Sequence, residues 1–70
     1  MKNITKQYQN TQLQMFANYP DIVSVDELMR MLKIGRNSAY KLLQDGTIKS
    51  FKVGNRYKIP KKEIIDYTLL

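Results

Sequence analysis

Arg36, Asn37 and Ser38 are side chains of the kinds that proteins use to contact nucleic-acid bases and phosphates. Arginine can donate two hydrogen bonds to guanine O6 and N7, and asparagine can pair in the same way with adenine N6 and N7. If a helix begins here, its free backbone N–H groups also favour a phosphate. The alternative is that Asn37 and Ser38 are merely good residues for the first turn of a helix. Lys41 follows one turn later on the same face, whereas Tyr40 lies between the faces and either caps the core or bonds a phosphate.

A second group of polar and basic side chains surrounds Gly54. A turn at this position would present Asn55 and Arg56 at its tip, with Lys52 and Lys58 behind them. Such a prong suits the minor groove of duplex DNA or the phosphates that flank it. An ordinary solvated turn is the alternative interpretation.

The basic residues are concentrated in one part of the chain. The 70-residue sequence holds twelve Lys and Arg against six Asp and Glu, a net charge of +6. Residues 36–62 hold eight of these cations and one carboxylate, Asp45, so this stretch alone carries +7. A charge of this kind attracts polyanions through counterion release, and its concentration in one stretch favours nucleic acid over a basic character that serves solubility alone.

The composition excludes several other kinds of site. The sequence contains no cysteine and no histidine, which removes disulfides, thiolate nucleophiles and the usual zinc ligands. The carboxylates do not cluster, and the glycines are too far apart for a phosphate-binding loop. No apolar run reaches the roughly 18 residues of a membrane span, and the first residues lack the features of a signal peptide. We therefore expect a cytoplasmic protein that is not an enzyme and needs no cofactor, metal or small-molecule ligand.

The group that begins at Arg36 needs a helix, a turn and a second helix to position it. Ser24 and Glu27 form an S-x-x-E capping box, which predicts a first helix from about Val25 to Leu32. The following stretch, 33–35, is too short for anything but a tight turn. We expect Gly35 to adopt there a conformation closed to other residues.

The helical period resumes after this turn, with Ala39, Leu42 and Leu43 on the inward stripe. A small residue such as Ala39 lets two helices approach at the steep angle of a helix-turn-helix. Asp45 and Gly46 end the second helix, with Gly46 in a left-handed conformation.

From residue 48 to residue 59 the hydrophobic period changes to two, and Gly54 with Asn55 marks a turn at its middle, so we predict a β-hairpin. A two-residue loop would leave neither face apolar. A three-residue loop, 54–56, gathers all the apolar side chains on one face. We predict this three-residue loop.

In that register Val53 pairs with Tyr57 and Phe51 pairs with Ile59, so that all four tie the hairpin to the core. The outer face then carries two lysines directly opposite each other. Like charges in this position repel, and their placement makes best sense against an external anion. These two residues are Lys52 and Lys58.

The two ends of the chain frame this module. Pro60 suits the first position of a closing helix that covers the core from the hairpin side. Lys61 and Lys62 fit a solvated helix face as well as they fit a track of phosphate contacts. Residues 1–20 are rich in amides and are predicted to form either an N-terminal arm or a short accessory helix, and residues 21–70 the folded domain.

The joint order of these segments resembles the excisionase-type, MerR-like winged helix-turn-helix family. The resemblance spans about residues 21–67 and is carried by the runs 23–28, 33–43, 46–48 and 51–60. It implies a mainly α fold with a small β-hairpin: a helix-turn-helix, a two-stranded wing and a C-terminal helix. It further implies that the second helix lies in the major groove and the wing in the adjacent minor groove. Gly35 stands where the family commonly has a serine cap.

The family includes excisionases, which act with a tyrosine recombinase and bend attachment-site DNA, and transcription regulators. MerR regulators proper have a long dimerising helix after the wing, which we do not expect here. The leading hypothesis is a bacterial or phage-encoded excisionase, or recombination directionality factor, that binds double-stranded DNA sequence-specifically. Its expected partner is a tyrosine integrase. Cooperative self-association on DNA is a further possibility. The alternatives are a small transcriptional regulator and a protein-interaction adaptor without DNA binding. The residues expected to contact DNA are Arg36, Asn37, Ser38, Tyr40, Lys41, Lys52, Asn55, Arg56 and Lys58.

Overall fold

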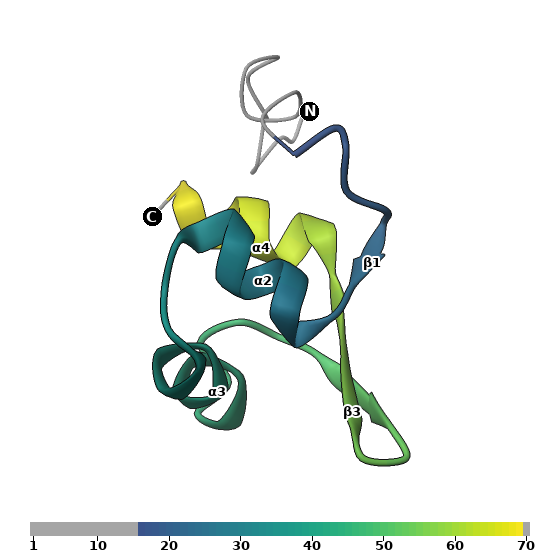
Figure 1. Cartoon of the computed structure of the whole chain (residues 1–70), viewed down its shortest axis with the longest axis vertical. Helices are drawn as coiled ribbons and strands as arrows, with labels where there is room; N and C mark the ends of the chain where they lie inside the picture. The colour runs from purple at the N-terminus through teal and green to yellow at the C-terminus, as the bar shows by residue number, and fades with distance from the viewer. Residues whose placement is uncertain (1–15, 70) are drawn as a thin grey trace, which may run out of the picture.

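The computed structural model describes residues 16–69, which form a helix-turn-helix, a hairpin and a last helix (Figure 1). The mainly α winged helix-turn-helix fold is therefore confirmed. Most of the predicted N-terminal arm or accessory helix lies outside the described residues. The elements are β1 (Ile22–Val23), α2 (Val25–Leu32), α3 (Arg36–Gln44), β2 (Phe51–Val53), β3 (Arg56–Pro60) and α4 (Lys61–Thr68).

Helix α2 begins at the predicted capping box. The Glu27 backbone N–H donates to Ser24 Oγ at 3.2 Å, and the Ser24 N–H donates to Glu27 Oε1 at 2.8 Å. These two bonds satisfy backbone donors that a helix start leaves free. The apolar stripe of α2, with Leu28 at its centre, is buried.

The turn between α2 and α3 differs from the prediction at Gly35. The residue with left-handed backbone is Lys33, at φ 56° and ψ 49°, where α2 ends and the Ile34 N–H donates to Met29 O. Gly35 has φ −78° and ψ 172°, an extended conformation open to any residue. The prediction was wrong because the helix needs its left-handed residue directly at its end, two positions before the glycine.

A strand that the sequence did not predict ties the start of the domain to its end. β1 pairs with β3, with Val23 opposite Ile59 and Ile22 opposite Pro60, so that β3 is central in a three-stranded antiparallel sheet. Pro60 thus ends β3 and precedes α4, whereas we expected it in the first helical position. Two residues are too few for an alternating pattern to reveal β1.

The register of the hairpin also differs from the prediction. Val53 lies opposite Arg56, Lys52 opposite Tyr57 and Phe51 opposite Lys58, which leaves a two-residue turn. The predicted three-residue loop is wrong, and so is the pairing of Lys52 with Lys58.

Turn chemistry explains this register. Gly54 has φ 62°, and a glycine with positive φ at the first central position is the preference of a type II′ hairpin turn. Phe51 and Val53 remain 50% and 58% exposed, whereas Ile59 is fully buried. The hairpin projects beyond the core (Figure 1), so its tip has no apolar surface to cover and the preference of the turn prevails.

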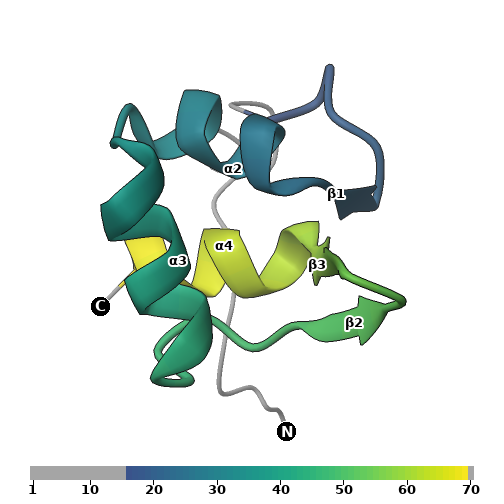
Figure 2. The ribbon, with the colours of Figure 1, turned by 60° about the horizontal axis from the view of Figure 1, so that its bottom comes forward.

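The core lies between the three helices and the central strand (Figure 2). Ala39, at the predicted close approach of α2 and α3, is fully buried. Phe16 is also buried, which extends the packed part of the chain five residues before position 21. The largest side chains that are almost completely buried are Leu28, Ile48, Ile59, Ile64 and Val23.

Candidate nucleic-acid interface

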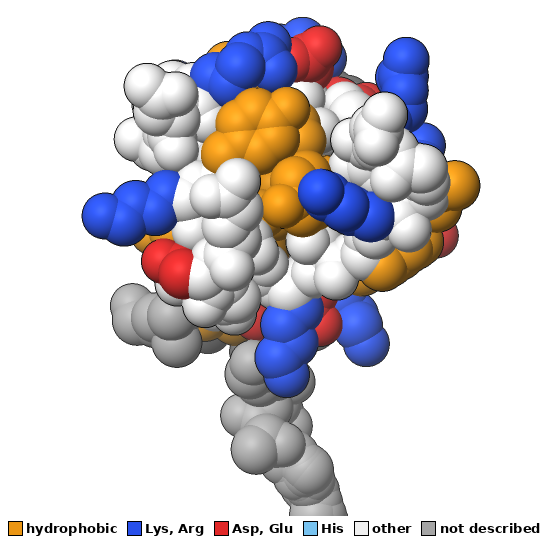
Figure 3. Space-filling model, turned by 90° about the horizontal axis from the view of Figure 1, so that it is seen from below, with side chains coloured by type: hydrophobic (Ala, Val, Ile, Leu, Met, Phe, Trp, Pro, Cys, Tyr) orange, Lys and Arg blue, Asp and Glu red, His pale blue; other side chains and the backbone are white. Residues whose placement is uncertain are grey.

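Helix α3 and the tip of the wing form one end of the molecule (Figure 1). Burial of Ala39 and Leu43 fixes the rotation of α3, because these residues form its inward stripe. Seen end-on, a hydrophobic patch occupies the middle of this face, and Lys and Arg side chains are spread around it (Figure 3). The side chains of α3 that this rotation leaves exposed are Arg36, Asn37, Ser38, Lys41 and Gln44.

A depression of about 190 Å³ lies between α3, the wing and the start of α2. It brings together residues that the sequence separates by more than thirty positions. Three cations and one carboxylate line it, a net charge of +2, so it suits a single anion better than a neutral ligand. Its lining residues are Ser24, Val25 and Asp26 from the start of α2, Arg36 and Tyr40 from α3, and Asn55, Arg56, Tyr57 and Lys58 from the wing.

Asp26 is the residue of this site that sequence reasoning missed as a partner of Arg36. Arg36 Nη2 donates to Asp26 Oδ1 at 2.9 Å, and both side chains are more than half exposed. Hydrogen bonding with Asp26, and secondly with Tyr40, raises the pKa of Arg36 above its ordinary value. An arginine is fully charged at neutral pH in any case. No local signal marks this pair, because ten positions separate the two residues.

An aromatic contact joins α3 to the wing. The rings of Tyr40 and Tyr57 lie with their centroids 5.8 Å apart at an angle of 55°. Lys52 Nζ lies 4.8 Å from the centroid of the Tyr57 ring, on the same face of the hairpin. The ring of Tyr40 therefore takes part in packing. Tyr40 also lines the depression, so its hydroxyl remains a candidate for bonding a phosphate.

The other face of the hairpin carries Arg56 and Lys58 beside exposed Phe51 and Val53. Asn55 and Arg56 are exposed at the tip, as the position of the turn requires, and Lys58 is half-buried. The cations of the wing therefore divide between two faces. Lys52 is on the same face as Tyr57, and the other two are on the opposite face and line the depression.

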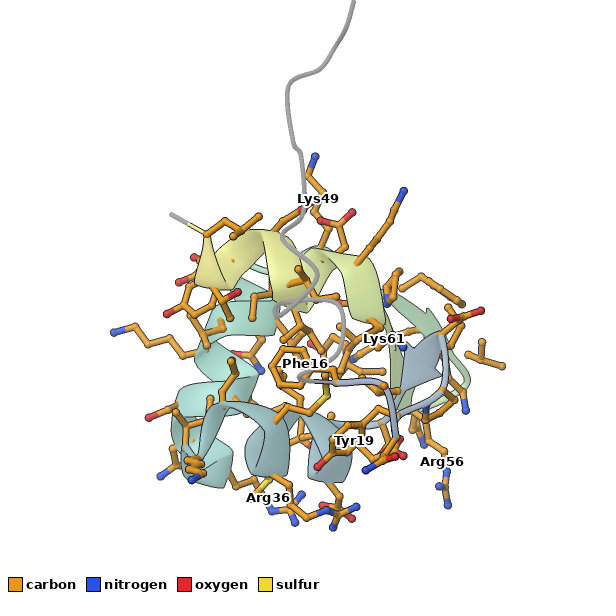
Figure 4. All side chains as sticks on the ribbon, turned by 90° about the horizontal axis from the view of Figure 1, so that it is seen from above. Phe16, Tyr19, Arg36, Lys49, Arg56 and Lys61 are labelled. Atoms are coloured by element: carbon orange, nitrogen blue, oxygen red, sulfur yellow. The ribbon has the colours of Figure 1, made fainter. Side chains whose placement is uncertain are left out.

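Lys61 is not available for a phosphate track. Its Nζ donates to the backbone oxygens of Tyr19 at 3.0 Å and Phe16 at 3.3 Å. Figure 4 shows Lys61 directed toward these two residues, whereas Arg36 and Arg56 point outward along one edge and Lys49 lies at the opposite edge. Lys62, one position later, is exposed.

Comparisons with known proteins find one family and two relatives. The sequence model of the family described as "Helix-turn-helix domain" matches residues 22–68. A "Probable excisionase" of Saccharopolyspora erythraea is 35% identical over 46 residues, which are 66% of this chain and 47% of that protein. An "Excisionase" of Streptomyces ambofaciens is 29% identical over 48 residues, 69% of this chain and 77% of that protein.

The matched region spans about half the length of the first of these relatives. No solved structure matches the chain. Across residues 16–69 none of the helices combines the length and the apolar character that crossing a membrane requires.

Proposed function

This chain belongs to the helix-turn-helix domain family, and on that premise we propose that it binds double-stranded DNA sequence-specifically and acts as an excisionase. The observation that carries the proposal is the placement of α3 and the wing tip on one end of the molecule, with a cationic depression between them. A major groove about 12 Å wide admits a helix, and a wing beside it reaches the neighbouring minor groove. The depression then faces the phosphate backbone between the two grooves.

The exposed residues take distinct roles in this arrangement. Arg36, Asn37 and Ser38 open α3, the part of a recognition helix that reaches base edges. Lys41 lies one turn along the same face and contacts a phosphate, and Tyr40 bonds a phosphate across the depression. At the wing, the tip enters the minor groove and the two strands contact its phosphates. The wing residues concerned are Asn55 and Arg56 at the tip and Lys52 and Lys58 on the strands.

The names of the two relatives support the excisionase role. In this role the protein bends attachment-site DNA and directs a tyrosine integrase toward excision, and copies associate on neighbouring sites. We propose further that it acts in the cytoplasm of a bacterium, is not an enzyme and needs no cofactor. Among the described residues no group of three metal-ligating side chains is found.

Binding to duplex DNA over a range of salt concentrations tests the interface. The logarithm of affinity should fall linearly with the logarithm of salt concentration, by about 0.9 per phosphate neutralised. Lys41→Ala should reduce this slope by about that amount. Lys49→Ala is the matched control, because Lys49 lies at the opposite edge from Arg36 and Arg56 (Figure 4) and should leave the slope unchanged.

Two results would contradict the interface. A protein-interaction adaptor would show no salt-dependent affinity for DNA at all. Unchanged affinity in the triple variant Arg36→Ala, Lys41→Ala and Arg56→Ala would exclude the surface assigned here.

Footprinting on the ends of the host element, with and without its integrase, tests the excisionase role. Protected direct repeats beside the recombination core, together with more excision in the presence of the protein, are the expected result. Repression of its own promoter without any effect on excision would instead identify a transcriptional regulator.

A further inference from the structure

The ion pair of Arg36 with Asp26 joins the first turns of the two helices of the helix-turn-helix. Arg36 is 56% exposed and Asp26 is 63% exposed. Pairs with this degree of exposure add little to folding, because water and salt screen them. A carboxylate at a DNA-binding face also repels phosphates. A negative charge in the first turn of α2 is favourable in itself, but neither folding nor general affinity for DNA accounts for the pairing of Asp26 with Arg36.

We propose that Asp26 orients the guanidinium of Arg36 so that its free edge reads a base, which makes Asp26 a positioning residue that sets sequence preference without touching DNA. The inference rests on the proposed function, since it assumes that α3 lies against base edges. It adds to that function the residue that makes one contact selective.

The geometry of the guanidinium supports this role. Arginine has five N–H donors in a planar fork, and Asp26 occupies one of them, on Nη2. Even with a second donor engaged by Tyr40, the five-donor fork retains enough N–H groups for the paired hydrogen bonds that guanine accepts. An exposed arginine without a partner has many rotamers, and this freedom is lost when it binds a base. Because the Asp26 carboxylate already restricts the guanidinium in the free protein, less conformational entropy is lost when DNA binds.

The carboxylate is itself held in place. Asp26 lies inside the capping box formed by Ser24 and Glu27, whose two hydrogen bonds fix the first turn of α2. The wall of the same depression, with Tyr40 beside Arg36, limits the space into which the guanidinium can turn. Residues that recognise a particular base depend on this kind of support, because a loosely held side chain can bond to several different bases.

A competing account makes different predictions. If Arg36 binds a phosphate, that phosphate and Asp26 compete for one guanidinium. Loss of Asp26 would then strengthen binding to every DNA sequence by the same factor. If Asp26 orients Arg36 toward a base, its loss lowers the preference at one base pair and leaves the preference at the other positions intact.

Selection from a random duplex library separates these accounts, because it reveals the preferred base at every position of the bound DNA. The full chain is compared with Arg36→Ala, Asp26→Ala and Asp26→Asn, and with Asp21→Ala as a control that removes an exposed carboxylate outside the depression. Arg36→Ala should lower the preference at one base pair by about 5- to 150-fold. Asp26→Ala should lower it at the same base pair by roughly 3- to 30-fold. Asp26→Asn, which keeps an acceptor oxygen, should restore most of it.

The double variant Asp26→Ala with Arg36→Ala should show no further loss at that base pair beyond Arg36→Ala alone, as expected for two residues that act as a unit. Asp21→Ala should leave all preferences unchanged. A general weakening of α2 would lower affinity for all sequences alike, and that outcome would overturn the inference.

Two other outcomes would also overturn it: an unchanged preference in Asp26→Ala, or an equal gain in affinity for every sequence. Both leave the proposed function standing, because the wild-type chain still selects a sequence. If the wild-type chain selects none, the proposed function fails as well as the inference.

Discussion

Lys52 lies directly across the hairpin from Tyr57, with its ammonium 4.8 Å from the centre of the tyrosine ring. The same ring contacts Tyr40 of α3. These three side chains form a continuous link from the wing to the recognition helix. An exposed cation–π contact of this kind contributes about 0.5–1 kcal/mol. Its further effect is to fix the position of the wing relative to α3, which decides whether both can reach DNA together.

The register of the hairpin predicts a contrast between two apolar residues. Ile59 is fully buried, so Ile59→Ala should lower the free energy of unfolding by about 2–5 kcal/mol. Phe51 is half exposed, so Phe51→Ala should cost less than about 1 kcal/mol. Urea denaturation of both variants measures the difference. Equal and large losses would indicate that Phe51 packs on the core, as in the three-residue register.

Helix α3 begins without a side-chain cap, and a serine can supply one. Gly35 has an extended backbone, and a Cβ added there meets no atom within 4 Å, so Gly35→Ser fits without strain. We expect a gain of a few tenths of a kcal/mol in unfolding free energy, because serine caps a helix better than glycine. Thermal unfolding of the variant beside the wild-type chain measures this gain.

Gly46→Ala is the contrasting substitution, measured by the same thermal unfolding. Gly46 has φ 80°, a conformation that costs an alanine roughly 1–2 kcal/mol. The melting temperature of the Gly46→Ala variant should therefore fall. A gain in Gly46→Ala, or a loss in Gly35→Ser, would conflict with the backbone angles of these two residues.

Lys61 holds the segment before β1 against the domain through its bonds to Phe16 and Tyr19. Lys61→Met keeps the apolar stem and removes the ammonium, and it should lower the unfolding free energy by about 1–3 kcal/mol, as for hydrogen bonds from a charged donor. Lys62→Met removes the same charge from an exposed neighbour and should change stability by less than about 0.5 kcal/mol. Unfolding curves at equal salt compare the two. Similar values for both variants would show that the contacts of Lys61 add nothing.

Asp45 gives the end of α3 a dependence on pH. Hydrogen bonds from the Thr47 hydroxyl and the Thr47 backbone N–H, and then the nearby charge of Lys41, lower the pKa of Asp45. A carboxyl whose pKa is lower in the folded chain stabilises the fold above its unfolded pKa and loses this effect as pH falls through the folded pKa. The loss should therefore occur below about pH 4.

Chemical shifts of Asp45 followed by NMR across this range should give a midpoint below that of an aspartate in an unfolded peptide. The Asp45→Asn variant should lose stability at neutral pH and show a weaker dependence below about pH 4. A midpoint at or above the peptide value would contradict the assigned hydrogen bonds.

Local patterns in the sequence were sufficient for the helices and for the ends of most of them. The capping box at Ser24 and Glu27 and the left-handed Gly46 were both predicted, because each depends on residues within four positions. The exposed face of α3 followed from the spacing of Ala39 and Leu43. The wing is predictable as a hairpin but its register is not, because hydrophobic alternation favours a three-residue loop whereas Gly54 favours a two-residue turn.

What the sequence by itself determined is thus the order of the elements, the charge of the face and the residue types at the start of α3. Only the tertiary structure decided that Val23 pairs with Ile59, that Lys61 turns inward and that Arg36 meets Asp26. The physical reason is the range of the interactions. Caps, turns and helical stripes are formed by neighbours along the chain, whereas these three contacts join segments that become neighbours only when the shared core has packed.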